Sequence, residues 1–118
     1  MASYSRLILS ASTSGKGVSV VATVTTGTTI HTAVSGSAAF DEIYLWVSNI
    51  DTVAHQLTIE YGAAGAATAH LVDTLSIPAN SPPIPICPGL VLNGGLLVTA
   101  FADTANKLIL FGYVNRIQ

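Results

Sequence analysis

The sequence predicts one all-β domain over residues 1–118, an antiparallel, jelly-roll-like β-sandwich of about eight or nine short strands with little or no helix. Three observations predict it. Apolar residues alternate with polar ones at period two in several segments. Gly, Pro, Asn and Asp recur between those segments, and no segment has the apolar spacing of an amphipathic helix. A chain of 118 residues is long enough for one hydrophobic core.

The N-terminal third is predicted to form three strands, over residues 4–10, 17–24 and 28–34. In the second of these, every other residue from Val18 to Val24 is apolar, which is typical of a strand with one buried face. Thr26-Gly27 then favours a turn. Residues 1–6 are also expected to serve as a short N-terminal arm that reaches a neighbouring molecule.

Alternation is clearest in the middle of the chain. There Leu57, Ile59 and Tyr61 are expected to face the core, and the polar residues between them are expected to face away. The segment from Ala63 to Ala69 contains a glycine and has no amphipathic stripe, so it is predicted to be a flexible loop with at most one helical turn. The remaining strands are predicted over residues 42–50, 56–61, 69–77, 84–87 with 90–92, 96–102 and 107–115.

Two of the predicted strands are apolar on both faces, Ile43–Val47 and Leu108–Phe111. A sandwich strand in a monomer normally presents a polar face to water. Covering one extra strand face that carries Tyr44 and Trp46 contributes several kcal/mol at about 25 cal/mol per Å². We expect a neighbouring subunit to supply the cover, and the alternative is a long loop of the same chain packed over the sheet.

Charged residues are scarce, at 8% of the chain with a net charge of −2, against roughly a quarter in an ordinary soluble domain. Much of the surface is therefore expected to be covered. A membrane span is not predicted, because the longest apolar stretch, Leu90–Phe101, is interrupted by Asn93-Gly94-Gly95. Direct nucleic-acid binding is not predicted either, because the four basic residues are scattered: Arg6, Lys16, Lys107 and Arg116.

No catalytic or cofactor-binding pattern is recognisable. His31, His55 and His70 share no close-spaced ligand motif, so each is expected to be a half-exposed polar residue of a strand, and no metal site is predicted. The single cysteine, Cys87, is expected to be a buried or half-buried inert thiol. The acidic residues are expected mainly in turns or on solvent faces: Asp41, Glu42, Asp51, Glu60, Asp73 and Asp103.

Five segments together resemble small virion proteins of tailed bacteriophages. They contain a strand ending at an Asn, a partner strand ending at a Gly, a Pro corner, a Gly-containing turn and a closing strand with Gly112. The segments are residues 43–49, 57–62, 77–80, 88–95 and 107–117. The resemblance is greatest to capsid decoration, or cement, proteins.

This resemblance implies a non-enzymatic protein that binds the major capsid protein lattice, commonly as a homotrimer, and stabilises the head. No secretory signal is recognised at the N-terminus, so synthesis in the host cytoplasm and a place on the virion surface are expected. The alternatives are a head-tail connector, a tail component, or a carbohydrate- or receptor-binding module.

Aromatic residues dominate the centres of protein interfaces. We therefore predict that Tyr44, Trp46, Phe111 and Tyr113 contact neighbouring subunits, with Tyr4 and Arg6 contributing from the N-terminal arm. The alternative for the four aromatic residues is the core of the domain itself. For Trp46 the sequence does not favour either place.

Overall fold

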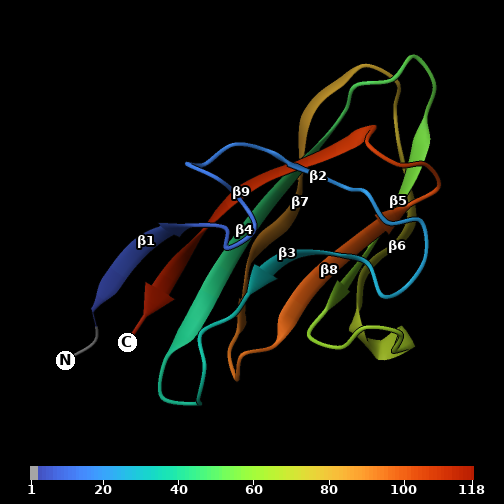
Figure 1. Cartoon of the computed structure of the whole chain (residues 1–118). Coiled ribbons are helices and arrows are strands. Elements are labelled where there is room, and N and C mark those ends of the chain that lie inside the picture. The colour runs from blue at the N-terminus through green and yellow to red at the C-terminus, as the bar shows by residue number, and fades with distance from the viewer. Residues whose placement is uncertain (1–2) are drawn as a thin grey trace.

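The computed structural model describes residues 3–118 and confirms an all-β sandwich of two antiparallel sheets (Figure 1). Sheet A has the strand order β1-β9-β4-β7, and the short β2 also pairs with β9. Sheet B has the order β3-β8-β5-β6. The nine strands are β1 (Tyr4–Ile8), β2 (Val18–Ser19), β3 (Thr28–Thr32), β4 (Phe40–Asn49), β5 (His55–Tyr61), β6 (His70–Ile77), β7 (Ser81–Leu92), β8 (Leu97–Ala102) and β9 (Leu108–Ile117), with a single 3-10 turn, η1 (Ala67–Ala69), before β6.

The core lies between the two sheets and is built by period-two alternation. In β4, every other side chain from Ile43 to Val47 is completely buried, and the intervening side chains are half-buried on the outer face. The inner face of β5 contributes Leu57 and Ile59, as the sequence predicts. Tyr61 is half-buried against the same core. The two sheets therefore bury one face each against the other.

Gly112 allows β4 and β9 to lie close together at the centre of sheet A. It is paired with Leu45, and a Cβ atom at position 112 would lie 2.1 Å from the carbonyl oxygen of Tyr44. Only a residue without a side chain fits there. The contact fixes the alignment of the two strands that carry most of the outer aromatic residues.

The predicted strand over residues 17–24 is wrong beyond Ser19. β2 belongs to sheet A and β3 to sheet B, so the chain between them must cross from one sheet to the other. Its backbone forms isolated hydrogen bonds instead of a continuous ladder. The N–H of Val20 donates to the carbonyl of Leu108 at 2.9 Å, and the carbonyl of Ala22 accepts the N–H of Ala102 at 3.1 Å. The Thr28 hydroxyl accepts the N–H groups of Val21 and Ala22 at 3.1 and 3.0 Å.

The strand predicted over residues 84–87 with 90–92, after a turn at residues 78–83, is in fact longer, because β7 runs without interruption from Ser81 to Leu92. Its prolines are tolerated because β7 lies at an edge of sheet A, where a missing N–H does not break an interior ladder. The expected N-terminal arm is also corrected in part: residues 4–6 belong to β1 and pair with β9. Residues 1–2 of that arm lie outside the described part of the chain.

Candidate interaction surface

Four aromatic side chains and one arginine lie together on the outer face of sheet A. We call this group the aromatic cluster; its members are Arg6, Tyr44, Trp46, Phe111 and Tyr113. The rings of Tyr44 and Tyr113 are stacked, with centroids 4.9 Å apart. Trp46 is also stacked with Tyr113, at 6.0 Å. The guanidinium carbon of Arg6 lies 4.8 Å from the centroid of the Tyr113 ring, a cation–π contact.

Strand register brings these residues together although they are far apart in the sequence. Tyr44 is paired with Tyr113, and Trp46 with Phe111, so all four rings point to the same side of sheet A. Tyr44, Trp46, Phe111 and Tyr113 are half-buried, whereas their neighbours Ile43, Leu45 and Val47 are fully buried. The structure therefore places Trp46 on the outer face and not in the core.

Polar groups border one end of the aromatic cluster. The Tyr44 hydroxyl donates to Glu42 Oε1 at 2.9 Å, and this hydrogen bond raises the pKa of Tyr44. The Asn115 amide donates to the same carboxylate at 3.4 Å, and Arg6 Nε donates to the Asn115 side chain at 3.4 Å. An apolar centre with a polar rim is the usual composition of a protein interface.

The other residues on this face differ in exposure. Phe111 is partly shielded by its own chain, because a Cβ atom at Gly17 would lie 2.7 Å from its ring. Tyr4 lies on the same face opposite Ile117 and is 70% exposed, and it takes no part in the stacking described above. A segment of the same chain near Gly17 thus shields Phe111, whereas Tyr44, Trp46 and Tyr113 stay half-buried.

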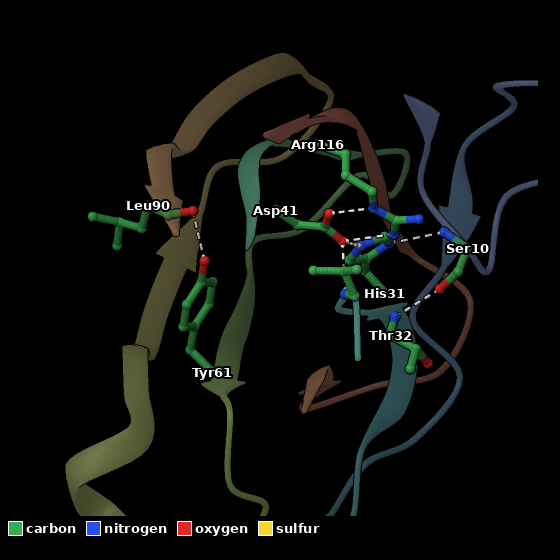
Figure 2. A network of polar contacts seen from close by, with 8 residues as sticks. Ser10, His31, Thr32, Asp41, Tyr61, Leu90 and Arg116 are labelled. Carbon is green, nitrogen blue, oxygen red and sulfur yellow. Dashed lines mark hydrogen bonds and ion pairs between the residues drawn. The ribbon is translucent and has the colours of Figure 1, made fainter. Parts of the chain in front are cut away.

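A second polar cluster, centred on Asp41, joins the two sheets (Figure 2). Arg116 Nε donates to Asp41 Oδ1 at 2.7 Å, and Nη2 donates to Oδ2 at 3.0 Å. His31 of sheet B lies 2.8 Å from the same Oδ2 through Nε2. Burial alone would raise the pKa of Asp41, but the hydrogen bonds from Arg116 and His31 outweigh it and lower the pKa.

Ser10, His31 and Asp41 are the residue types of a hydrolase triad, but their geometry is different from one. His31 Nδ1 accepts the backbone N–H of Ser10 at 3.0 Å, so Nε2 carries the proton that is donated to Asp41. The Ser10 hydroxyl accepts the N–H of Thr32 at 2.7 Å (Figure 2). The imidazole therefore has no free nitrogen directed at the hydroxyl, as a general base requires. This cluster braces the sandwich.

His55 forms a third polar cluster, at the end of the sandwich where two loops meet. Its Nε2 lies 2.7 Å from Asp51 Oδ2 and its Nδ1 lies 3.0 Å from Asp103 Oδ1. The hydrogen bond with Asp51 is the main cause of a raised pKa of His55, and the interaction with Asp103 adds to it. Both loops are thereby tied to the start of β5.

The expected exposure of several polar residues is wrong. His31 is 2% exposed and Asp41 is 0% exposed. Both can be buried because the hydrogen bond between them offsets the cost of removing their polar groups from water. Glu60 does face away from the core, but it is 1% exposed. Its carboxylate accepts hydrogen bonds from the Thr25 hydroxyl at 2.9 Å and from the N–H of Gly65 at 2.6 Å.

The burial of Cys87 and Tyr61 is close to what the sequence predicts. Cys87 is buried, its thiol donates to the carbonyl of Ile43 at 3.1 Å, and burial raises its pKa. Tyr61 packs against the core, and its hydroxyl donates to the carbonyl of Leu90 at 2.7 Å (Figure 2). Burial raises the pKa of Tyr61 far above its usual range.

Two hollows in residues 3–118 are small and open to solvent. One, of about 150 Å³, lies beside Thr58, Phe101 and Asp103, and another, of about 230 Å³, lies along Pro85–Pro88. Small-molecule sites usually have about 300 to 1,000 Å³. Within the same residues, no set of three His, Cys, Asp or Glu side chains is arranged to hold a metal ion, and no helix is long and apolar enough to cross a membrane.

Compared with protein-family models, curated proteins and solved structures, the chain matches none. The aromatic cluster unites five of the six residues that the sequence singled out for contacts with neighbours.

Proposed function

We propose that the chain is a non-enzymatic structural protein of a tailed-bacteriophage virion, a decoration protein that binds the major capsid protein on the head surface and stabilises the shell. The aromatic cluster is the surface through which it binds. Copies of the chain itself are proposed as further partners.

One observation carries this proposal: the second apolar face of β4 and β9 is directed outward. Tyr44, Trp46 and Tyr113 keep part of their surface in contact with water, although the domain already has a complete core in Ile43, Leu45 and their neighbours. Large aromatic side chains add little to the stability of a monomer when they are half-exposed, but they commonly anchor interfaces.

The low charge of the chain agrees with this proposal. The chain has only ten charged side chains, and seven of them are engaged in the polar contacts described above, so little charge remains to keep an isolated protein soluble. The seven are Arg6, Asp41, Glu42, Asp51, Glu60, Asp103 and Arg116. A surface that is covered by a shell needs less charge.

Sedimentation of the purified chain with phage heads that lack it tests the proposal. The heads should come from a phage whose genome encodes the chain. We expect the wild type to sediment with the heads and Trp46→Ala to bind at least about 30-fold more weakly, the effect of losing an interface residue worth about 2 kcal/mol. Gln56→Ala, on the exposed outer face of sheet B, is the matched control and should bind normally.

Three outcomes contradict the proposal. The wild type does not bind heads, Trp46→Ala binds as well as Gln56→Ala, or imaging of intact virions finds the chain only in the connector or the tail. Rings of six or twelve subunits would indicate a place in the connector or the tail.

A carbohydrate- or receptor-binding module is the second candidate, because Tyr44 and Trp46 lie on a water-facing surface beside the Glu42 carboxylate and the Asn115 amide. Stacking on an aromatic ring together with hydrogen bonds to such groups is a common way to bind sugars. A glycan array distinguishes the two, since a decoration protein is expected to give no specific signal and a binding module is expected to select one glycan class.

A further inference from the structure

Strand β1 presents an unpaired edge to solvent. Ser3 and Gln118 exchange both of their backbone hydrogen bonds, at 2.8 and 3.0 Å, so the ladder between β1 and β9 starts with a hydrogen-bonded pair. Such pairs alternate along an antiparallel ladder. The backbone N–H and C=O groups of Tyr4, Arg6 and Ile8 therefore point away from β9, and no other strand of residues 3–118 pairs with that side of β1.

The other three sheet edges are interrupted. β7 contains Pro82, Pro83, Pro85 and Pro88, none of which has an N–H to donate. β3 has a bulge between Thr29 and His31. β6 also pairs irregularly, and Thr74 in its middle has a φ of 52°. Proline and bulges are the usual means by which proteins block edge pairing, and β1 has neither.

The side chains of β1 suit a contact with another strand. Tyr4 is 70% exposed and Ile8 is 49% exposed, a high value for two apolar residues on one short strand. The one charged residue between them, Arg6, has its guanidinium over Tyr113 of the neighbouring β9, on the side away from the open edge. The open edge thus has an apolar residue at each end, and the guanidinium group of Arg6 is directed toward β9 and away from the edge.

We propose that two copies of the chain pair through β1 in antiparallel fashion, so that sheet A continues from one copy into the other. Tyr4 then lies opposite Ile8 of the partner subunit, and Arg6 lies on the two-fold axis. Three residue pairs exchange about six backbone hydrogen bonds. Like charges opposite each other destabilise a ladder, but the contact of each Arg6 with its own Tyr113 draws the two guanidinium groups apart.

A second copy is the favoured occupant because the edge is complementary to itself. Each of Tyr4, Arg6 and Ile8 offers one donor and one acceptor, and antiparallel pairing of identical strands satisfies all of them by symmetry. Pairing of β1 with another edge of a second copy is opposed by the prolines of β7 and the bulges of β3 and β6. Two-fold pairing predicts a dimer and differs from the trimer implied by the phage resemblance.

The mass of the purified chain in solution tests this proposal, independently of any binding to capsids. We expect the wild type to have twice the mass of one chain. Arg6→Pro removes an N–H that points to the open edge and leaves the ladder to β9 intact, so we expect its dissociation constant to rise about tenfold or more. Arg6→Thr is the matched control, since it keeps the N–H and should remain a dimer.

Amide hydrogen exchange gives a readout that needs no substitution. In the dimer the N–H groups of Tyr4, Arg6 and Ile8 are bonded, so their exchange is expected to slow as the concentration of the wild type rises. A monomer, a trimer, an Arg6→Pro variant that dimerises as well as Arg6→Thr, or fast exchange of these amides at high concentration each overturns the proposal. If Arg6→Pro does not fold, the exchange result alone decides.

Discussion

Asp41 and Arg116 form a two-point ion pair between the start of β4 and the end of β9, with N–O distances of 2.7 and 3.0 Å. The carboxylate is fully buried, whereas the side chain of Arg116 is 26% exposed. The two strands are thus locked at the end of sheet A where β3 of the other sheet also contributes His31.

Asp41→Asn is expected to lower the free energy of unfolding by about 2 to 3 kcal/mol, somewhat less than for a fully buried pair, because water still reaches Arg116. The pKa of Asp41 is lowered in the fold, so its contribution is present above the unfolded-state pKa of about 4 and is lost as the pH falls through the folded-state value. Urea unfolding at neutral and acidic pH measures both effects. Asp73→Asn, at a side chain that is 65% exposed, should change stability by less than about 0.5 kcal/mol.

His55 is expected to make stability depend on pH in the opposite direction. Its pKa is raised in the fold by Asp51 and Asp103, so its contribution is fully present below the unfolded-state pKa of about 6.5 and is lost as the pH rises through the folded-state value. The melting temperature of the wild type should therefore exceed that of His55→Asn by more at about pH 5.5 than at about pH 8.5. An equal difference at both values would show that the charge of His55 adds nothing.

Leu45→Ala is expected to cost about 3 kcal/mol, because it leaves a cavity at a completely buried position in the centre of sheet A. Tyr44→Ala, one position earlier on the outer face, should cost about 1 kcal/mol or less. Chemical denaturation of the two variants makes the comparison. Similar costs for both would mean that the outer face of β4 supports the fold as strongly as the inner face does.

Gly112→Ala is expected to destabilise the domain by about 3 kcal/mol or more, because the new methyl group would be placed against the Tyr44 carbonyl. Gly36→Ala provides the comparison. Gly36 has a φ of 78° and free space around it, so this substitution should cost only about 1 to 2 kcal/mol of backbone strain. Thermal unfolding of both variants tests the difference, and the prediction fails if Gly112→Ala is the milder of the two.

Much of the fold could be predicted from the sequence because period-two alternation and turn residues report local geometry directly. The strand around Leu57 and Ile59 was predicted to within one residue of its observed bounds. The path of the segment after Ser19 could not be predicted. Its apolar and polar residues alternate as in a strand, but its path is set by the fact that β2 joins sheet A and β3 joins sheet B. That choice depends on β8 and β9, which lie far along the chain.

The residues of the candidate surface could be predicted from the sequence, but the face of sheet A on which they lie could not. Doubly apolar strands indicate that some face needs cover, and this singled out Tyr44, Trp46, Phe111 and Tyr113. Alternation cannot tell which of two apolar faces is the inner one, so Trp46 stayed undecided. The burial of Asp41 was missed because its compensating partner, Arg116, is 75 positions away.

The prolines of β7 and the bulges of β3 and β6 also bear on how far self-association can proceed. Fibrillar aggregates grow by adding strands at both ends of a sheet without limit. In the proposed dimer, the joined sheet would end on both sides at a proline-containing β7, so growth would stop after a single step. A protein that must accumulate to high concentration gains from this, since its copies can meet often without polymerising.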